Sequence, residues 1–307
     1  MSDEPSKPDL EDSIDKLDKA IAGDRSEDNI DALKQAIDTS WPEIQLHLYQ
    51  QGAKEDDDTK YDVSYDGKRQ LPLGFDSWWL KDFIRDDVLM ELPGVVIMNT
   101  KPWHIGSACI SYREAYGIRK GEDCDDCFDE RDIESHIAIF PEGQFVAQRI
   151  SGPSAGNCVG MACTMRTSRP PSAPILPWME AIGDLRIAKH EADGDWLYGV
   201  EMAVHPMYQR HGIGTGLYQA RFDLVKRLNL RGWYAVGMLM GYHRYADSMD
   251  VSEYGERVIA GDFNDPTVTM QMNRGFRAQG VVADYVDEPA AGDAGVLIVW
   301  ENPDFDG

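Results

Sequence analysis

The sequence has no apolar run as long as the roughly 18 to 20 residues that a membrane-spanning helix needs. Its first residues, MSDEPSKPDLEDS, also lack the basic and then apolar pattern of a secretory signal peptide. We therefore expect no membrane partner and a cytoplasmic location. Cysteine is scarce too, since the 307 residues include only five, and an odd number in a large chain is typical of a reducing compartment.

A second pair of metal ligands is also missing. Cys124 and Cys127 have the spacing of half a metal-binding knuckle. A structural zinc site normally takes four ligands, and no further Cys or His pair follows at a matching distance. We therefore expect no metal ion.

Basic residues are few. The chain has 30 Lys and Arg against 54 Asp and Glu, which gives a formal charge of −24 and an isoelectric point near 4.5. Nucleic-acid affinity comes mainly from basic side chains that neutralise phosphates, so this balance argues against a nucleic-acid partner. Two interpretations of the acidity stay open, a solvated surface suited to a salty cytoplasm and a field that attracts a cationic substrate.

The chain divides into three parts by composition. Residues 1–70 are an acidic extension with few apolar residues, where short amphipathic helices and disorder both stay open. Residues 71–93 form an aromatic-rich connecting segment in which Phe75, Trp79 and Phe83 recur at helical spacing. Residues 94–302 alternate strand and helix patterns, which predicts an α+β (mixed α/β) domain. The expected strands cover 94–99, 143–150, 157–166, 195–206, 232–240, 275–285 and 294–300, and the expected helices cover 105–116, 131–139, 212–229 and a segment that starts at 265.

The segment with the clearest chemical meaning follows the strand that ends near Val204. A turn there holds Gly212, Gly214 and Gly216, and an amphipathic helix begins at once. Such a junction points backbone N–H groups outward at the positive end of a helix dipole, which suits a phosphate or pyrophosphate. The stretch 202–217 contains no carboxylate, so a polyanion could bind this acidic protein here, and solvation becomes the better explanation of the overall charge.

Two common nucleotide motifs are unlike this turn. A Walker loop needs Gly-Lys followed by Ser or Thr, and no Lys occurs between Lys189 and Lys226. A Rossmann fingerprint needs G-x-G-x-x-G, whereas the spacing here is G-x-G-x-G, and no acidic residue ends a strand about 20 residues later. From the glycines alone, a purely structural turn stays open.

The string VHPMYQRHGIGTGLY resembles the signature of the GNAT superfamily of acetyl-CoA-dependent N-acetyltransferases, whose acyl-CoA loop reads Q/R-x-x-G-x-G/A. Gln209, Gly212 and Gly214 match it in register. The resemblance covers residues 94–302 and implies a central, mostly antiparallel sheet flanked by helices. The strings FPEGQFVA, LYGVEMAVHP, GYHRYA and GVVADYV are most similar to GNAT domains found alone or fused to carbon–nitrogen hydrolase (nitrilase-like) domains.

The resemblance implies acetyl-CoA as co-substrate and a primary amine of a small molecule as acceptor, which attacks the thioester directly. Backbone groups of Ala203 and Val204 would pair with the pantetheine arm, Asn264 would reach the CoA arm, and N–H groups of the loop would hold the pyrophosphate. The implied cofactor-binding residues are Ala203, Val204, Gln209, Arg210, His211, Gly212, Ile213, Gly214, Thr215, Gly216 and Asn264.

The resemblance assigns proton transfer less completely. The Tyr that serves as general acid in the family falls at Gln271, which cannot donate as an acid. Glu201 is the only carboxylate in the middle of the cofactor strand and is the candidate base, with a structural hydrogen bond as the alternative. His243 and Tyr254, in the segment that borders the acceptor cleft in this architecture, are further catalytic candidates, with packing as the alternative.

The missing Tyr also keeps a second function open, an acyl-CoA-binding module of the same fold that acts without turnover as a sensor or partner subunit. Monomer and homodimer are both compatible with the sequence.

Overall fold

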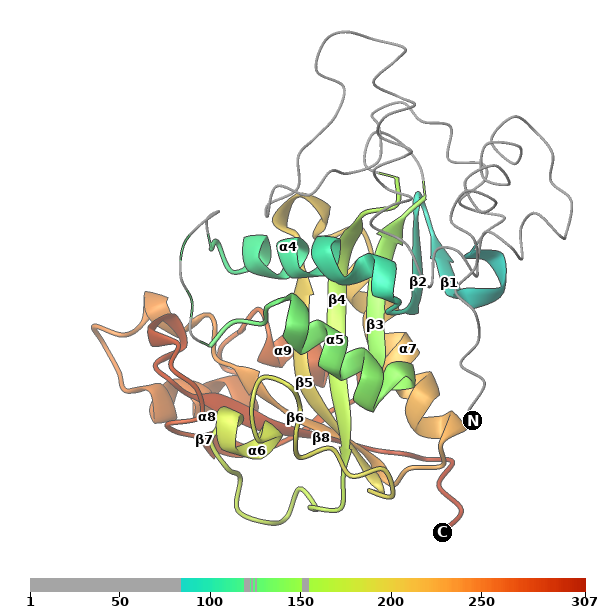
Figure 1. The fold of residues 1–307 in the computed structure, drawn as a ribbon. Coiled ribbons are helices and arrows are strands. Elements are labelled where there is room, and N and C mark those ends of the chain that lie inside the picture. Colours follow the sequence, from blue (N-terminus) through green and yellow to red (C-terminus); the bar gives the residue numbers. More distant parts are fainter. Residues whose placement is uncertain (1–83, 119–121, 123, 125, 151–154) are drawn as a thin grey trace, which may run out of the picture. The chain divides into compact units, whose positions relative to one another are not determined.

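The computed structural model describes residues 84–118, 122, 124, 126–150 and 155–307 (Figure 1). The predictions for the acidic extension and for the helical spacing of Phe75 to Phe83 lie outside these residues. The chain forms two compact units. The first comprises the described residues up to Ala162 together with Ala203–Ala220, and the second comprises Cys163–Met202 together with Arg221–Gly307.

The described residues form strands and helices in mixed order. The strands are β1 (Val88–Leu92), β2 (Val95–Asn99), β3 (Gln144–Arg149), β4 (Cys158–Thr167), β5 (Trp196–Val204), β6 (Gly232–Met238), β7 (Arg277–Val282) and β8 (Gly295–Glu301). The helices are α4 (Ile105–Ala115), α5 (Glu130–Ile139), α6 (Trp178–Ile182), α7 (Ile213–Arg227), α8 (Val251–Ala260) and α9 (Val268–Met272).

In the first unit, β2 is the central antiparallel strand, with β1 on one side and β3 on the other. Its residues from Val95 to Met98 are all buried, as expected for an apolar run covered on both faces. The predicted hairpin between β3 and β4 is present, because Arg149 N donates to Asn157 O at 2.9 Å and Gly156 N donates to Arg149 O at 2.8 Å. Figure 1 shows α4 and α5 side by side in front of the strands of this unit.

In the second unit the strand order is β5-β6-β8-β7. β6 and β8 pair antiparallel along their whole length, from Gly232 opposite Glu301 to Met238 opposite Gly295. β5 runs parallel to β6 but pairs with it only from Trp196 to Tyr198. The predicted α+β fold with a mostly antiparallel sheet is therefore confirmed. Its core contains a cluster of aromatic rings: Phe222, Trp233, Phe276 and Trp300.

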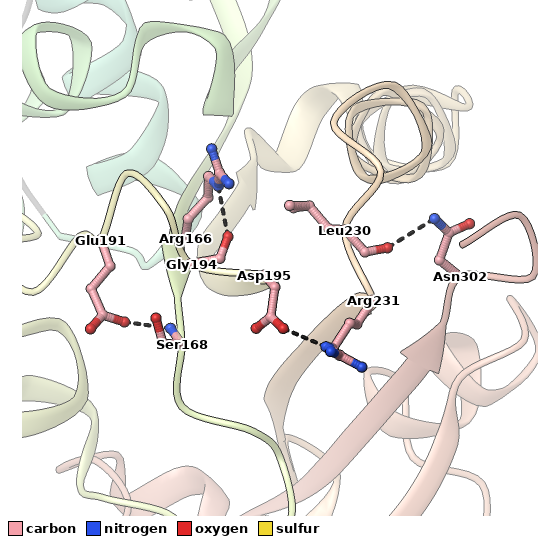
Figure 2. A network of polar contacts seen from close by, with 8 residues as sticks. All are labelled: Arg166, Ser168, Glu191, Gly194, Asp195, Leu230, Arg231 and Asn302. Carbon is pink, nitrogen blue, oxygen red and sulfur yellow. Dashed lines mark hydrogen bonds and ion pairs between the residues drawn. The ribbon is translucent and has the colours of Figure 1, made fainter. Parts of the chain in front are cut away.

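Polar contacts fix the strand ends of the second unit near the start of β5 (Figure 2). Arg166 Nε donates to Gly194 O at 2.9 Å, so the end of β4 is tied to the residues that precede β5. Asn302 Nδ2 donates to Leu230 O at 2.9 Å, which joins the end of β8 to the start of β6. The remaining contacts in the figure join Glu191 with Ser168 and Asp195 with Arg231.

Three local predictions need correction. Residues 88–92, placed in a connecting segment, form the edge strand β1, which packs its alternate side chains inward. Helix α8 was not expected in the polar segment that contains it. The last helix begins at Val268 and not at 265, although Asp265 does act as the expected cap, because its carboxylate accepts hydrogen bonds from Thr267 N and Val268 N.

Two of the five cysteines are paired, and the other three are free. Cys124 and Cys127 form a disulfide, a pairing that the sequence analysis did not foresee, whereas Cys109, Cys158 and Cys163 are free and buried. Among the described residues, no group of three His, Cys, Asp or Glu side chains could hold a metal ion. No helix in the described ranges is both long and apolar enough to cross a membrane.

His104 is a buried titratable group of the first unit. Its side chain is fully buried, and Nδ1 accepts a hydrogen bond from Lys101 N at 2.9 Å. Burial lowers the pKa of His104 to about 3, against the opposing effect of the neighbouring Gln148 side chain. The folded protein therefore keeps this ring neutral at pH values where an exposed histidine is charged.

We expect acid to destabilise the protein through His104. Between the ordinary pKa of 6.5 and the folded value of about 3, the unfolded chain binds the extra proton, so stability is lost as the pH falls through 6.5. At about 1.4 kcal/mol per pKa unit, lowering the pH from 7.5 to 5 costs about 2 kcal/mol. Urea unfolding of the wild type and of His104→Asn, whose Oδ1 can still accept from Lys101 N, measures this. The variant should lose about 2 kcal/mol less between the two pH values, and equal losses would contradict the prediction.

Candidate functional site

The junction between β5 and α7 has a strained backbone. After Val204 the chain makes a short 3-10 helix, Pro206–Tyr208, and α7 begins at Ile213. Between them Arg210 and Gly212 both have positive φ, of 64° and 85°. The left-handed conformation costs a non-glycine residue about 1 to 2 kcal/mol. Alternating backbone conformations of this kind turn N–H groups into one concavity, which is an anion-binding arrangement.

The three glycines of the loop differ in their surroundings. A Cβ atom added at Gly212 or Gly214 would meet nothing within 4 Å, so a ligand can approach the backbone at both. A Cβ atom at Gly216 would lie 2.9 Å from Cγ1 of Ile97 on β2. Gly216 N also donates to Gly212 O at 2.9 Å within the helix. Gly216 therefore allows α7 to pack on β2, and its role as a cofactor-binding residue stays a prediction.

The first turn of α7 leaves backbone N–H groups without an acceptor inside the helix. Gly216 N donates to Gly212 O, whereas the N–H groups of Ile213 and Gly214 have no acceptor inside the helix. They lie at the positive end of the helix dipole. Arg210 and His211 beside them are exposed. The start of α7 therefore carries available N–H groups next to an exposed cation in the sequence, a combination that suits an anionic ligand.

Side chains of the loop hold it against its own strand. Gln209 Nε2 donates to Val204 O at 3.1 Å, and His211 Nδ1 donates to Gln209 O at 2.8 Å. Gln209, predicted as a signature residue, thus closes the loop on the end of β5. Ala203 is buried, and its carbonyl oxygen would lie 3.2 Å from a Cβ atom added at Gly160 of β4.

Glu201 lies half-buried on β5, two residues before Ala203. Its Oε1 accepts a hydrogen bond from Met202 N at 2.7 Å, so the structural role considered for it is present. Burial and then the charge of Glu201 raise the pKa of the Cys163 thiol, while Arg221 opposes them. The Glu201 carboxylate therefore lies close enough to the buried thiol for its charge to act on it.

The other two catalytic candidates lie in different environments. Tyr254 is fully buried in α8 and its hydroxyl donates to Asp265 Oδ2 at 3.2 Å. Burial and then the Asp265 charge raise its pKa well above the ordinary value, so Tyr254 has the placement of a structural residue. His243 is exposed, and its Nδ1 donates to Met240 O at 2.9 Å. This bond does not involve the other ring nitrogen, Nε2.

The remaining predicted residues lie on the segment after α8. Asn264 is exposed, which suits a ligand contact. Gln271, at the position of the family's Tyr, is buried on α9. A Cβ atom added at Gly237 of β6 would lie 2.1 Å from Gln271 Oε1, so this amide packs against the strand backbone.

Trp178, which was not among the predicted site residues, contacts the residue that precedes Glu201 on β5. Trp178 Nε1 donates to Val200 O at 3.1 Å, beyond the point where β5 stops pairing with β6. Trp178 N also donates to Tyr285 O at 2.7 Å. The indole therefore donates to a backbone carbonyl of β5, and no local pattern in the proline-rich segment before Trp178 indicates this role.

Comparisons with known proteins agree on one family. A family model described as "Acetyltransferase (GNAT) family" matches residues 110–239. "Uncharacterized N-acetyltransferase YkwB" of Bacillus subtilis (strain 168) is 30% identical over 173 residues, which are 56% of this chain and 74% of YkwB. "Probable hydrolase YhcX" of the same organism is 35% identical over 172 residues, which are 56% of this chain but only 33% of YhcX.

Solved structures show the same fold. A "GphF GNAT-like decarboxylase in complex with isobutyryl-CoA" aligns with a TM-score of 0.55 and 17% identity, over 67% of this chain and 98% of that chain. The loading GNATL domain of CurA from Lyngbya majuscula aligns with a TM-score of 0.55 and 16% identity, over 68% and 98%. At these identities the likeness concerns the fold alone.

Proposed function

The chain belongs to the GNAT N-acetyltransferase family, which uses acyl-CoA, and we propose that it transfers an acetyl group from acetyl-CoA to a primary amine of a small molecule. The observation that carries this proposal is the loop between β5 and α7. Its two open glycines, the strained backbone at Arg210 and the N–H groups of Ile213 and Gly214 at the start of α7 suit the pyrophosphate of the cofactor.

The proposed reaction takes place in a ternary complex. The amine nitrogen attacks the thioester carbonyl carbon, and a backbone N–H at Ala203 or Val204 stabilises the oxygen that becomes negative. The C–S bond breaks as the amide forms. Glu201 accepts the proton that the amine loses, and the CoA thiolate takes up a proton to give free CoA. The products are the acetylated amine and CoA.

The buried cysteines support direct transfer. Burial raises the pKa of Cys158 to about 12 and that of Cys163 well above its ordinary value. Both therefore stay protonated at neutral pH, and a protonated thiol is a poor nucleophile. Neither is suited to form a covalent acyl-enzyme.

Two measurements test the proposal. Isothermal titration should show that acetyl-CoA binds, and a free-thiol release assay over a panel of small primary amines should find at least one that is acetylated. Binding without thiol release for any amine would favour the non-catalytic acyl-CoA-binding module, the alternative that Gln271 keeps open. No binding of acetyl-CoA would exclude both.

Glu201→Gln tests the proposed base. The amide keeps the size of the side chain but cannot accept the proton, so kcat with an active amine should fall roughly 100-fold or more. The Kd for acetyl-CoA should stay within about threefold, because the loop that holds the cofactor is unchanged. Glu301→Gln, at the exposed end of β8 beside Arg277, removes a surface carboxylate as a matched control. If Glu201→Gln and this control have the same kcat, Glu201 is not the base, and its role is limited to the structural hydrogen bond with Met202 N.

A further inference from the structure

The residues between β5 and the cofactor loop are held in place by side chains that have no role in the proposed reaction. His205 follows β5 directly, and its N–H donates to Val159 O of β4 at 3.0 Å. Its Nδ1 accepts a hydrogen bond from Met207 N at 3.1 Å and so caps the short 3-10 helix. Its Nε2 lies 2.7 Å from Oε2 of Glu114 on α4. Both ring nitrogens are therefore engaged.

Tyr208, three residues after His205, is held in place by a side chain as well. Its hydroxyl accepts a hydrogen bond from Arg149 Nη1, at the end of β3, at 2.7 Å. Its ring lies edge-on to His205, with 5.4 Å between the ring centroids. Together these contacts tie the entrance of the loop to β3, to α4 and to Val159 in the first half of β4, all within the first unit.

The two contacts of His205 depend on each other. Because Nδ1 accepts from a backbone N–H, it carries no proton, and the proton of the neutral ring is on Nε2. There the Glu114 carboxylate accepts it. Without Glu114 the ring can hold its proton on Nδ1 instead, facing Met207 N–H, and the cap is lost. Glu114 thus fixes the tautomer of His205, as carboxylates do for histidine at many sites.

We infer that Glu114 and His205 are positioning residues for the cofactor loop and act through the Met207 cap. This inference rests on the proposed function. The strained conformation of Arg210 comes shortly after the cap, and such a conformation persists only where the surrounding structure holds it. N–H groups that are already aligned bind a ligand without the entropy cost of ordering them. The pair therefore raises the affinity for acetyl-CoA without touching the reacting atoms.

Isothermal titration with acetyl-CoA tests this on the full chain. His205→Ala should raise the Kd about tenfold and Glu114→Ala about three- to tenfold. His205→Asn should stay within about threefold of the wild type, because its Oδ1 can accept from Met207 N as Nδ1 does. Glu134→Ala removes an exposed carboxylate of α5 in the same unit and should change nothing.

A double variant makes the test sharper. Asn has no tautomer for Glu114 to fix, so adding Glu114→Ala to His205→Asn should not raise the Kd further. The unfolding temperatures of all variants should stay within about 3 °C of the wild type. The inference is overturned if His205→Asn weakens binding as much as His205→Ala, if Glu114→Ala acts equally in both backgrounds, or if no variant changes the Kd. A wild type that does not bind acetyl-CoA would instead refute the proposed function.

Discussion

Replacing Gly212 with Glu should abolish acetyl-CoA binding while the protein stays folded. A side chain at this position enters open space, since nothing lies within 4 Å of the added Cβ atom, so the fold need not change. The same open space is where the pyrophosphate would approach the backbone, and the new carboxylate would repel it. We expect a loss of affinity of roughly 100-fold or more by isothermal titration, which corresponds to about 3 kcal/mol.

Two further variants separate the causes of that loss. Gly212→Gln adds the same bulk and the same cost of a positive φ without the charge, so its affinity should lie between those of the wild type and Gly212→Glu. Gly261→Glu places the same residue in the same backbone conformation, φ 83°, with nothing within 4 Å, at the end of α8. It should bind acetyl-CoA nearly as the wild type does. An unchanged affinity of Gly212→Glu would refute the pyrophosphate assignment.

The strands around this loop could be predicted because their patterns are local. Apolar runs such as Val95–Met98 and the turn residues between β3 and β4 indicate the same structure that forms. The turn between β5 and α7 could be located in the same way, since Gln209, Gly212 and Gly214 carry the signature in sequence alone, and its role in cofactor binding stays a prediction. The packing role of Gly216 could not be predicted, because it depends on Ile97, which comes close to Gly216 only in the folded sheet.

Helix α8 was missed although a signal for it is present. Asp250 caps the helix through Glu253 N at 2.9 Å, and an Asp followed three residues later by Glu is a helix-start pattern. The apolar pattern is present as well, since Val251, Tyr254 and Val258 recur at helical spacing and the last two are buried. Because no helix was expected there, Tyr254 was interpreted as a polar side chain at the border of the acceptor cleft. Placed on α8, it points into the core.

Asp265→Asn should strongly destabilise the protein, because the buried Asp265 carboxylate accepts hydrogen bonds from residues around α8 and α9. The side chain is fully buried. One carboxylate oxygen accepts from Gly241 N at 2.8 Å and from the Tyr254 hydroxyl at 3.2 Å, and the other accepts from Thr267 N at 2.8 Å and Val268 N at 3.0 Å. In either orientation the Asn amide group faces a backbone N–H. We expect a loss of roughly 3 kcal/mol or more in the free energy of unfolding.

Chemical denaturation measures this loss, and two variants show its origin. Asp262→Asn removes an exposed carboxylate just before the same segment and should change stability by less than about 0.5 kcal/mol. Tyr254→Phe removes one of the four donors and should cost about 1 kcal/mol. Because the tyrosine hydroxyl is buried and bound to Asp265, this variant should keep the thiol release rate of the folded enzyme within about threefold. A large fall in kcat with unchanged stability would instead return Tyr254 to the catalytic residues.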